Sequence, residues 1–292
     1  MRQQFKQTVM DLASKDDKIV LIFGDVSVYL FNDFVKKYHD RFYNLGICEN
    51  TLVSVGAGMS SRGFFPFIHT IAPFITERSF EQIKIDMCYN QFGGNIVSCG
   101  ASFDYASDGA THHSYYDLAL LRLLPNIEVI QPGSKKELDI LLRSQYSNGR
   151  TTYFRLSDYP HSVNIPVEFG KGVIIKDLSA SVTIMSAGPI LGNVLEACKD
   201  LEINLVYFHT IKPIDRDLIQ KFRNTDIIVI HDAFGLYEAI CEVGGLSVSY
   251  YGLKDEYCNS YGKINDVHRC LGLDSESIKS FLRTKIKNRR FS

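Results

Sequence analysis

Several charged and polar residues stand where they could take part in chemistry. Asp25 directly follows a short apolar strand, Glu49 opens a helix, and Arg155 ends the strand TTYFR. Between Glu49 and Arg155 lies the polar segment SDGATHH, which carries Asp108 and His112. Polar residues at the carboxyl ends of parallel strands commonly line a site, and loops that carry converging polar groups concentrate function. The sequence therefore predicts a polar site around Glu49.

The helix expected over 49–61 begins with this carboxylate and continues with small residues, Gly56, Ala57, Gly58 and Ser60. An acid in the first turn of a helix has an ordinary explanation, because the helix dipole favours negative charge there. Each glycine costs a helix about 1 kcal/mol relative to alanine. The two glycines indicate tight packing against this backbone, and a plain contact between helix and sheet would explain it equally well.

The overall composition is that of a water-soluble protein. The chain has 292 residues, enough for two domains, and a formal net charge of −1. That charge gives no electrostatic attraction to nucleic acid or to an anionic membrane. The apolar run Ile19 to Phe23 is far too short to span a bilayer, and residues 1–18 lack the apolar core of a signal peptide. We therefore expect a cytoplasmic protein that binds neither nucleic acid nor membrane.

The seven cysteines do not suggest a metal site. The chain has no CxxC pair and no His/Cys cluster with metal-ligand spacing, so we expect no metal ligands on it. Cys48 lies beside Glu49 and is a possible nucleophile, but no base and orienting group are evident around it. Reduced, mostly buried thiols are the simpler interpretation.

Strands and helices alternate along the chain, which predicts an α/β fold with mostly parallel sheets and helices on both faces. Phe5, Val9 and Leu12 share one face of an amphipathic helix at the start. A segment with two prolines and no periodicity follows the strand at 151–156, and the alternation then begins again. We predict two α/β domains, 1–158 and 171–292, joined by a linker over 159–170.

Four motifs in the first domain resemble the pyrimidine-binding domain of thiamine-diphosphate enzymes of the transketolase type. They are RFYNLGICENTLVSVGAGMSSRGFFPF, FITERSFEQIKID, SDGATHH followed by LRLLPN, and QPGSKKE. The second domain is similar to the transketolase C-terminal domain in SAGPILGNVLEACKDL, FHTIKPIDRDLI and LGLDSESI. The resemblance covers nearly the whole chain and implies thiamine diphosphate as cofactor. It also implies transfer of a two-carbon ketol unit between sugars.

The resemblance assigns three residues to the cofactor. Glu49 matches the glutamate that hydrogen-bonds the cofactor's pyrimidine ring and so promotes loss of a proton from the thiazolium ring. Phe74 matches the aromatic residue that stacks on the pyrimidine, although a plain core phenylalanine is the alternative. Asp25 matches a carboxylate on the cofactor side, with a simple strand-end turn as its alternative.

Four further residues are assigned to the substrate by the same resemblance. Asp108 and His112 match residues that contact the sugar hydroxyls and carbonyl oxygen, roles that suit an acceptor carboxylate and a donor imidazole. His113 competes with His112, but the family has its histidine directly after threonine. Arg155 matches an arginine that binds the substrate's phosphate, which suits a bidentate guanidinium. Arg78 is either a second phosphate contact or part of a structural salt bridge.

One expected element is missing from the chain. Enzymes of this type hold the diphosphate through Mg²⁺ in another α/β domain, with a Gly-Asp-Gly segment and a downstream asparagine. Here Gly24-Asp25 is followed by Val26 and belongs to the pyrimidine-binding domain. The resemblance therefore implies a split enzyme, in which an N-terminal transketolase subunit holds the diphosphate and Mg²⁺ and the two chains assemble as α2β2.

Two segments depart from the family pattern, Phe103 to Ser107 and Ile230 to Tyr237. The first is expected to touch the channel for the acceptor sugar, and the second to lie far from the chemistry. Two other functions remain open. A β subunit of a 2-oxoacid dehydrogenase shares the fold and the glutamate, although DGATH favours sugars. A non-catalytic scaffold would keep the fold, but it would not need Glu49, Asp108 and His112.

Overall fold

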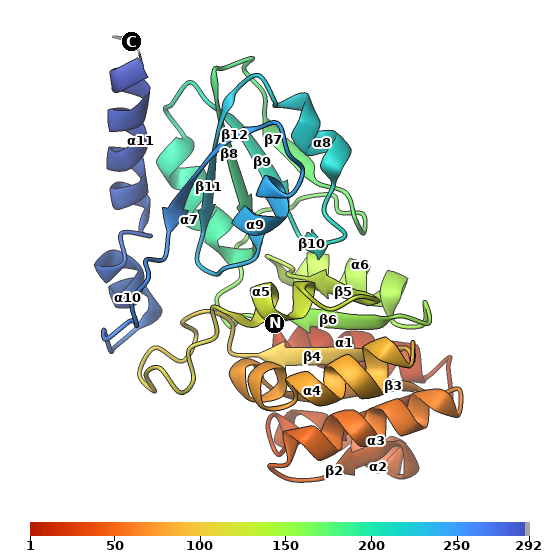
Figure 1. The fold of residues 1–292 in the computed structure, drawn as a ribbon. Coiled ribbons are helices and arrows are strands. Elements are labelled where there is room, and N and C mark those ends of the chain that lie inside the picture. Colours follow the sequence, from red (N-terminus) through yellow and green to blue (C-terminus); the bar gives the residue numbers. More distant parts are fainter. Residues whose placement is uncertain (290–292) are drawn as a thin grey trace.

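The computed structural model describes residues 1–289 and contains two mostly parallel sheets stacked end to end (Figure 1). The first sheet has seven strands in the order β10-β5-β6-β4-β3-β1-β2, and the second has five in the order β12-β11-β8-β9-β7. Among these strands, only β10 and β7 run antiparallel to their neighbours. The predicted α/β class, with mostly parallel sheets, is confirmed.

Buried apolar strands form the centre of the first sheet. In β1, β4 and β6 every residue is buried, as expected for parallel strands covered on both faces. The strands are β1 (Ile19–Phe23), β2 (Phe42–Asn44), β3 (Phe65–Ile71), β4 (Gly94–Cys99), β5 (Ile127–Ile130) and β6 (Thr151–Arg155). All of them run parallel, so their carboxyl ends share one edge, where the predicted site residues lie.

Helices cover both faces of this sheet, and successive strand residues point to opposite cores. Leu21 and Phe67 pack in the core that includes Phe5, while Ile22 and Ile68 pack in the core that includes Leu52. The predicted inward face of the first helix, with Phe5, Val9 and Leu12, is confirmed. The helices are α1 (Arg2–Ala13), α2 (Asn32–Lys37), α3 (Glu49–Ser61), α4 (Phe80–Gln82), α5 (Asp117–Arg122) and α6 (Lys135–Gln145).

The segment after β3 differs from its prediction. From the sequence alone, residues 71–74 with Pro73 predict a turn, and Ile75 to Tyr89 predict one helix. Instead the chain is already helical at Ala72, and it is π-helical over Phe74–Arg78 and again over Ile83–Tyr89, on either side of the short α4. Wide helical turns of this kind are rare and occur often at functional sites.

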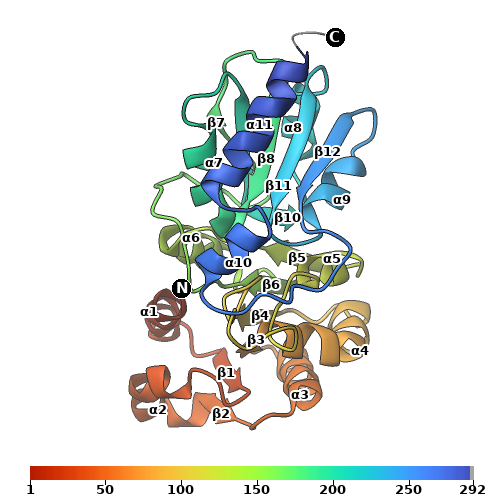
Figure 2. The ribbon, with the colours of Figure 1, turned by 90° about the vertical axis from the view of Figure 1, so that its left-hand side faces the viewer.

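The second sheet also carries helices on its faces. Its strands are β7 (Val173–Lys176), β8 (Val182–Ala187), β9 (Asn204–Phe208), β11 (Asp226–His231) and β12 (Ser247–Gly252). Its helices are α7 (Leu191–Cys198), α8 (Arg216–Lys221), α9 (Leu236–Cys241), α10 (Ile264–Cys270) and α11 (Ser275–Arg289), and α11 packs beside α7 (Figure 2). The sequence did not predict β7, β12, α10 or α11. Across residues 1–289, no helix is both long and apolar enough to cross a membrane.

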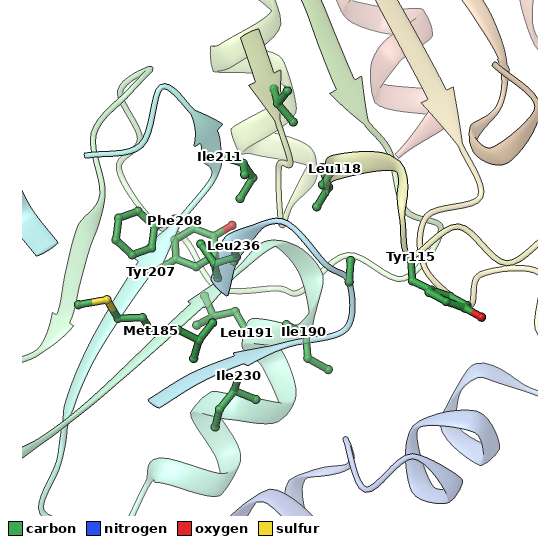
Figure 3. Close-up of a cluster of buried hydrophobic side chains, with 14 of the residues drawn as sticks. Tyr115, Leu118, Met185, Ile190, Leu191, Tyr207, Phe208, Ile211, Ile230 and Leu236 are labelled. Atoms are coloured by element: carbon green, nitrogen blue, oxygen red, sulfur yellow. The ribbon is translucent and has the colours of Figure 1, made fainter. Parts of the chain in front are cut away.

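The two sheets are physically joined. After β9 the chain crosses to the first sheet as β10 (Thr210–Lys212), which pairs antiparallel with β5. Apolar side chains from both parts then form one continuous core, in which Leu118 of the first part lies with Ile211 and Leu236 of the second (Figure 3). The position of the carboxyl edge of the first sheet is therefore set by both halves of the chain.

The two glycines of α3 have different environments. A Cβ at Gly56 would lie 2.5 Å from Ile68 Cδ1, whereas a Cβ at Gly58 would meet no atom within 4 Å. At Gly56 the tight packing inferred from the sequence is therefore a close contact between helix and sheet.

We expect alanine at these two positions to have opposite effects on the free energy of unfolding of the isolated chain. Gly58→Ala should stabilise it by roughly 0.5–1 kcal/mol, because alanine favours the helix. Gly56→Ala should destabilise it by about 1–3 kcal/mol, because the new methyl group overpacks the core. Urea unfolding followed by circular dichroism measures both, and equal shifts would contradict the contact.

Candidate active site

Glu49 lies at the start of α3, at the carboxyl edge of the first sheet, and is 3% exposed. Its Oε2 forms a salt bridge with Arg78 Nη1 at 3.3 Å. Its Oε1 is buried and has no hydrogen-bond partner. A buried polar atom without a partner is uncommon in proteins and calls for an explanation. The carboxyl group is thus oriented on one side and available for a hydrogen bond on the other.

Arg78, Phe74 and His112 form a contiguous group next to Glu49. The Arg78 guanidinium lies 4.1 Å from the centre of the Phe74 ring, a cation–π contact. The Phe74 and His112 rings meet edge to face at 5.1 Å. The π-helical turn brings this contact about, because it contains both Phe74 and Arg78. Four of the seven predicted site residues therefore lie in one chain of contacts.

The loop 100–116 carries the two predicted sugar contacts in different settings. Asp108 is exposed and accepts a hydrogen bond from Ser107 Oγ at 3.2 Å. His112 is half-buried, with its Nδ1 2.9 Å from Thr111 Oγ1. His113 instead turns into the core, where it is 3% exposed and packs edge-on against Phe103, and burial lowers its pKa. Of the two histidines, only His112 contacts the Phe74 group among the described contacts.

Asp25 lies at the same sheet edge but outside the Glu49 group. It is exposed, with φ at 65° in the left-handed region. Its side chain accepts from Asn44 Nδ2 at 3.1 Å, and Asn44 Oδ1 in turn accepts from the Asp25 backbone N–H at 3.0 Å. This reciprocal pair joins the ends of β1 and β2. The predicted contact of Asp25 with a cofactor stays a prediction.

Arg155 is 1% exposed, and its guanidinium is bound to the protein. Its Nε donates to Asp117 Oδ2 at 2.7 Å, its Nη1 to Ser102 Oγ at 3.1 Å, and its Nη2 to the Ser114 carbonyl. Burial alone would lower the pKa of Arg155, but the charge and hydrogen bond of Asp117 outweigh it and raise that pKa. Arg155 does not join the Glu49 group, and its predicted role in binding phosphate stays untested.

The residues present fit thiamine diphosphate in one respect that the structure makes plain. The unpartnered Glu49 Oε1 offers the single hydrogen bond that the cofactor's pyrimidine ring would need, beside an aromatic residue, Phe74. Within residues 1–289, no group of three or more His, Cys, Asp or Glu side chains could hold a metal ion. The fit therefore concerns the pyrimidine end of the cofactor.

The sequence did not reveal several supporting residues. Asn50 Nδ2 donates to the Arg78 carbonyl at 2.8 Å and to Gln82 Oε1 at 2.7 Å, which anchors the π-helical turn. Asp117 neutralises Arg155 from 38 residues away. In the unusual segment Phe103 to Ser107, Asp104 turns inward and accepts from Ser157 Oγ at 2.8 Å. The sequence offered one clue to Asp117. Arg155 ends a strand that is expected to be buried, and a buried arginine requires an acidic partner.

Comparison with known proteins bears out the family resemblance. The family model for the transketolase pyrimidine-binding domain matches residues 1–158. A putative transketolase C-terminal section from Methanocaldococcus jannaschii is 28% identical over 306 residues, covering 98% of this chain and 96% of that protein. One subunit of the apulose-4-phosphate transketolase from Phocaeicola vulgatus is 28% identical over 298 residues, covering 95% of this chain and 94% of that protein.

A solved structure gives the same answer for the fold. It is described as a split gene transketolase in the form of an inactive β4 tetramer, and it superposes with a TM-score of 0.85 at 29% identity. The match covers 97% of this chain and 97% of that chain. This chain therefore belongs to the transketolase family and carries that family's pyrimidine-binding domain over residues 1–158.

Proposed function

We propose that this chain is one subunit of a heteromeric, thiamine-diphosphate-dependent enzyme that transfers a two-carbon ketol unit between sugars. The observation that carries the proposal is the Glu49 carboxyl group, which is buried, is held on one oxygen by Arg78 and lacks a partner on the other. A structural helix-end carboxylate has no need of that arrangement. A scaffold that only kept the fold would have no use for it either.

In this proposal the cofactor, when bound, supplies the acidic thiazolium carbon that takes up the two-carbon unit. Glu49 Oε1 hydrogen-bonds the pyrimidine ring, and Arg78 keeps the carboxyl group in place from 3.3 Å. Burial strengthens such a hydrogen bond, because the surroundings are less polarisable than water. Phe74 packs on the pyrimidine, which adds about 0.5–1.5 kcal/mol beyond area burial. Asp25 completes the cofactor side from the ends of β1 and β2.

The sugar contacts come from the loop 100–116. His112 donates a hydrogen bond to the carbonyl oxygen of the sugar, and Asp108 accepts from its hydroxyl groups. Arg155 and Arg78 are the candidates for a phosphate group. The relative from Phocaeicola vulgatus is described as a transketolase subunit for a phosphorylated sugar, which supports the same class of substrate here.

A second subunit completes the site in this proposal. It contributes the Gly-Asp-Gly segment that this chain lacks, and with it the diphosphate and Mg²⁺. The solved relative is described as an inactive β4 tetramer of a split-gene transketolase, which supports both self-association and dependence on another chain. An α2β2 assembly is the simplest arrangement in which this chain both self-associates and binds the other subunit.

The isolated chain should bind thiamine diphosphate weakly and show no ketol transfer. Only half of the cofactor has ligands on this chain, so the diphosphate and Mg²⁺ stay unbound. Calorimetry with cofactor and Mg²⁺, followed by a ketol-transfer assay with and without the co-purified partner, measures both properties. Robust transfer by this chain alone would refute the split-enzyme proposal.

Glu49→Gln should abolish turnover of the assembled complex while leaving assembly intact. Glutamine keeps the size of the side chain but cannot share a proton with the pyrimidine ring. Steady-state assays give turnover, and size-exclusion chromatography gives the assembly state. Glu81→Gln, on the exposed side of α4, is a matched control that should retain activity. Near-normal turnover in Glu49→Gln would remove Glu49 from its proposed role.

Substitution of the two adjacent histidines, His112 and His113, should affect catalysis differently. His112→Asn should lower kcat/KM by about 10²–10³-fold, the loss typical when one donor to a developing oxyanion is removed. His113→Leu should leave turnover per folded molecule close to normal, because His113 faces the core. Kinetics and thermal unfolding of both variants test this. The reverse pattern would assign the sugar contact to His113.

A further inference from the structure

A cavity lined by residues of both halves of the chain lies apart from the Glu49 group. It has a volume of about 180 Å³. One wall comes from the first part of the chain and includes Ser102, Asp104 and Arg155, and the opposite wall includes Asn193, Asp232 and His268. His161, from the segment between the sheets, also lines it. Ligand sites often occur where two layers of a protein meet in this way.

Three side chains in this cavity are buried and have polar atoms without a protein hydrogen bond. They are Asp232 Oδ1, His161 Nδ1 and His268 Nε2, on residues that are 4%, 9% and 8% exposed. Leaving such an atom unpaired costs about 1–3 kcal/mol. The other acidic group in the walls is already engaged, since Asp104 accepts from Ser157 Oγ and the Asp158 N–H.

The neighbours of His268 determine which of its nitrogens carries the proton. Asn193 Nδ2 donates to the Leu273 carbonyl at 2.9 Å, which fixes the orientation of the Asn193 amide. The same Nδ2 lies 3.2 Å from His268 Nδ1, so Nδ1 must accept. Burial lowers the pKa of His268 and favours the neutral ring. The proton therefore lies on Nε2, a donor that has no hydrogen-bond partner in the protein.

Asp232 presents an acceptor, and His161 presents its Nδ1. His161 Nε2 lies 3.2 Å from Glu137 Oε1. Burial alone would raise the pKa of Glu137, but hydrogen bonds that include those from His161 and Tyr207 lower it, so Glu137 is ionised and Nε2 carries a proton. His161 Nδ1, on the other side of the ring, has no hydrogen-bond partner in the protein. Asp232 Oδ1 is a carboxylate acceptor, and its neighbour His231 Nε2, at 3.8 Å, is beyond hydrogen-bonding distance.

This set of atoms excludes several kinds of ligand. A phosphate or carboxylate would face the negative charge of Asp232, and the Arg155 guanidinium in the same lining is already bound to Asp117, Ser102 and Ser114. An ammonium group would suit Asp232 but would leave the donor at His268 Nε2 without an acceptor. No cluster of ligating side chains within residues 1–289 could hold a metal ion. A hydroxyl group both donates and accepts, so neighbouring hydroxyls can satisfy all three atoms together.

We infer that this cavity is a binding site for a small, uncharged, polyhydroxylated molecule, held by Asp232, His161 and His268. The volume corresponds to about six water molecules at ~30 Å³ each, which suits a linear polyol of about four or five carbons. The site is separate from the proposed cofactor group, because none of Glu49, Phe74 and His112 lines it. The cavity shares Arg155 with the proposed substrate site, but the inference rests on the three unpaired side chains and not on the proposed function.

Isothermal titration calorimetry on the full chain tests this inference. The probes are erythritol and ribitol, with D-ribose 5-phosphate as an anionic comparison and 1,4-diaminobutane as a cationic one. We expect saturable one-to-one binding of at least one polyol, tighter than either charged probe. Absence of saturation by both polyols at millimolar concentrations would mean that only water fills the cavity. Either that result or tighter binding of a charged probe would overturn the inference.

Substitutions in the cavity test whether the polyol binds there. His268→Phe removes the Nε2 donor at the expense of a slightly larger ring, and Asp232→Asn replaces the carboxylate by a weaker, neutral acceptor of the same size. Each should weaken polyol binding by about tenfold or more. Glu49→Gln and His112→Asn should leave polyol binding unchanged. If His268→Phe does not fold, judged by circular dichroism, then Asp232→Asn alone decides. Unchanged binding in the folded cavity variants, or binding lost in Glu49→Gln, would refute the site.

Discussion

The buried ion pair between Arg155 and Asp117 determines how the carboxyl edge of the first sheet is built. Both side chains are fully buried, so neither charge is solvated by water, and Tyr153 OH adds a hydrogen bond to the same Asp117 oxygen at 2.6 Å. Removing one partner of such a pair costs about 3–5 kcal/mol, because the other charge stays buried. Arg155 also binds Ser102 Oγ and the Ser114 carbonyl, which are the two ends of the loop that carries His112. The ion pair therefore closes that loop at its base and limits where His112 can lie.

The second half of the chain supports the same loop. The Phe234 N–H donates to the Tyr115 carbonyl at 2.8 Å, and the Phe234 ring stacks on Tyr116 with centroids 5.6 Å apart. Phe234 belongs to the segment from Ile230 to Tyr237, which the sequence suggested would lie far from the chemistry. The structure brings this segment against one end of the loop, because β9 leads into β10 at the edge of the first sheet. Its distance from the chemistry stays a prediction. Phe234 of this segment thus holds the end of the loop through both its backbone and its ring.

Features that are determined by residues close together in the chain were predicted well. Contacts between residues far apart in the chain were not. The strand β1 is a continuous apolar run and was predicted closely, whereas the edge strands β7 and β12 are half-exposed and show no such run. Glu49 was expected at the start of a helix and lies there, because the place where a helix starts depends on neighbouring residues. The contact of Arg78 with Phe74 was not foreseen, because it needs a π-helical turn that propensities do not indicate. Pairing of Arg155 with Asp117 depends on long-range folding and leaves no pattern of spacing.

Glu49 and Arg78 together suggest how binding and stability are connected in this chain. Arg78 is half-exposed, so its salt bridge is partly screened by water and contributes little by itself. The buried Glu49 Oε1, by contrast, costs about 1–3 kcal/mol while it lacks a hydrogen bond. A ligand that hydrogen-bonds this atom removes that cost only in the folded chain, and so stabilises the fold by mass action. In our proposal, binding of the cofactor is therefore coupled to folding most directly through Glu49 Oε1.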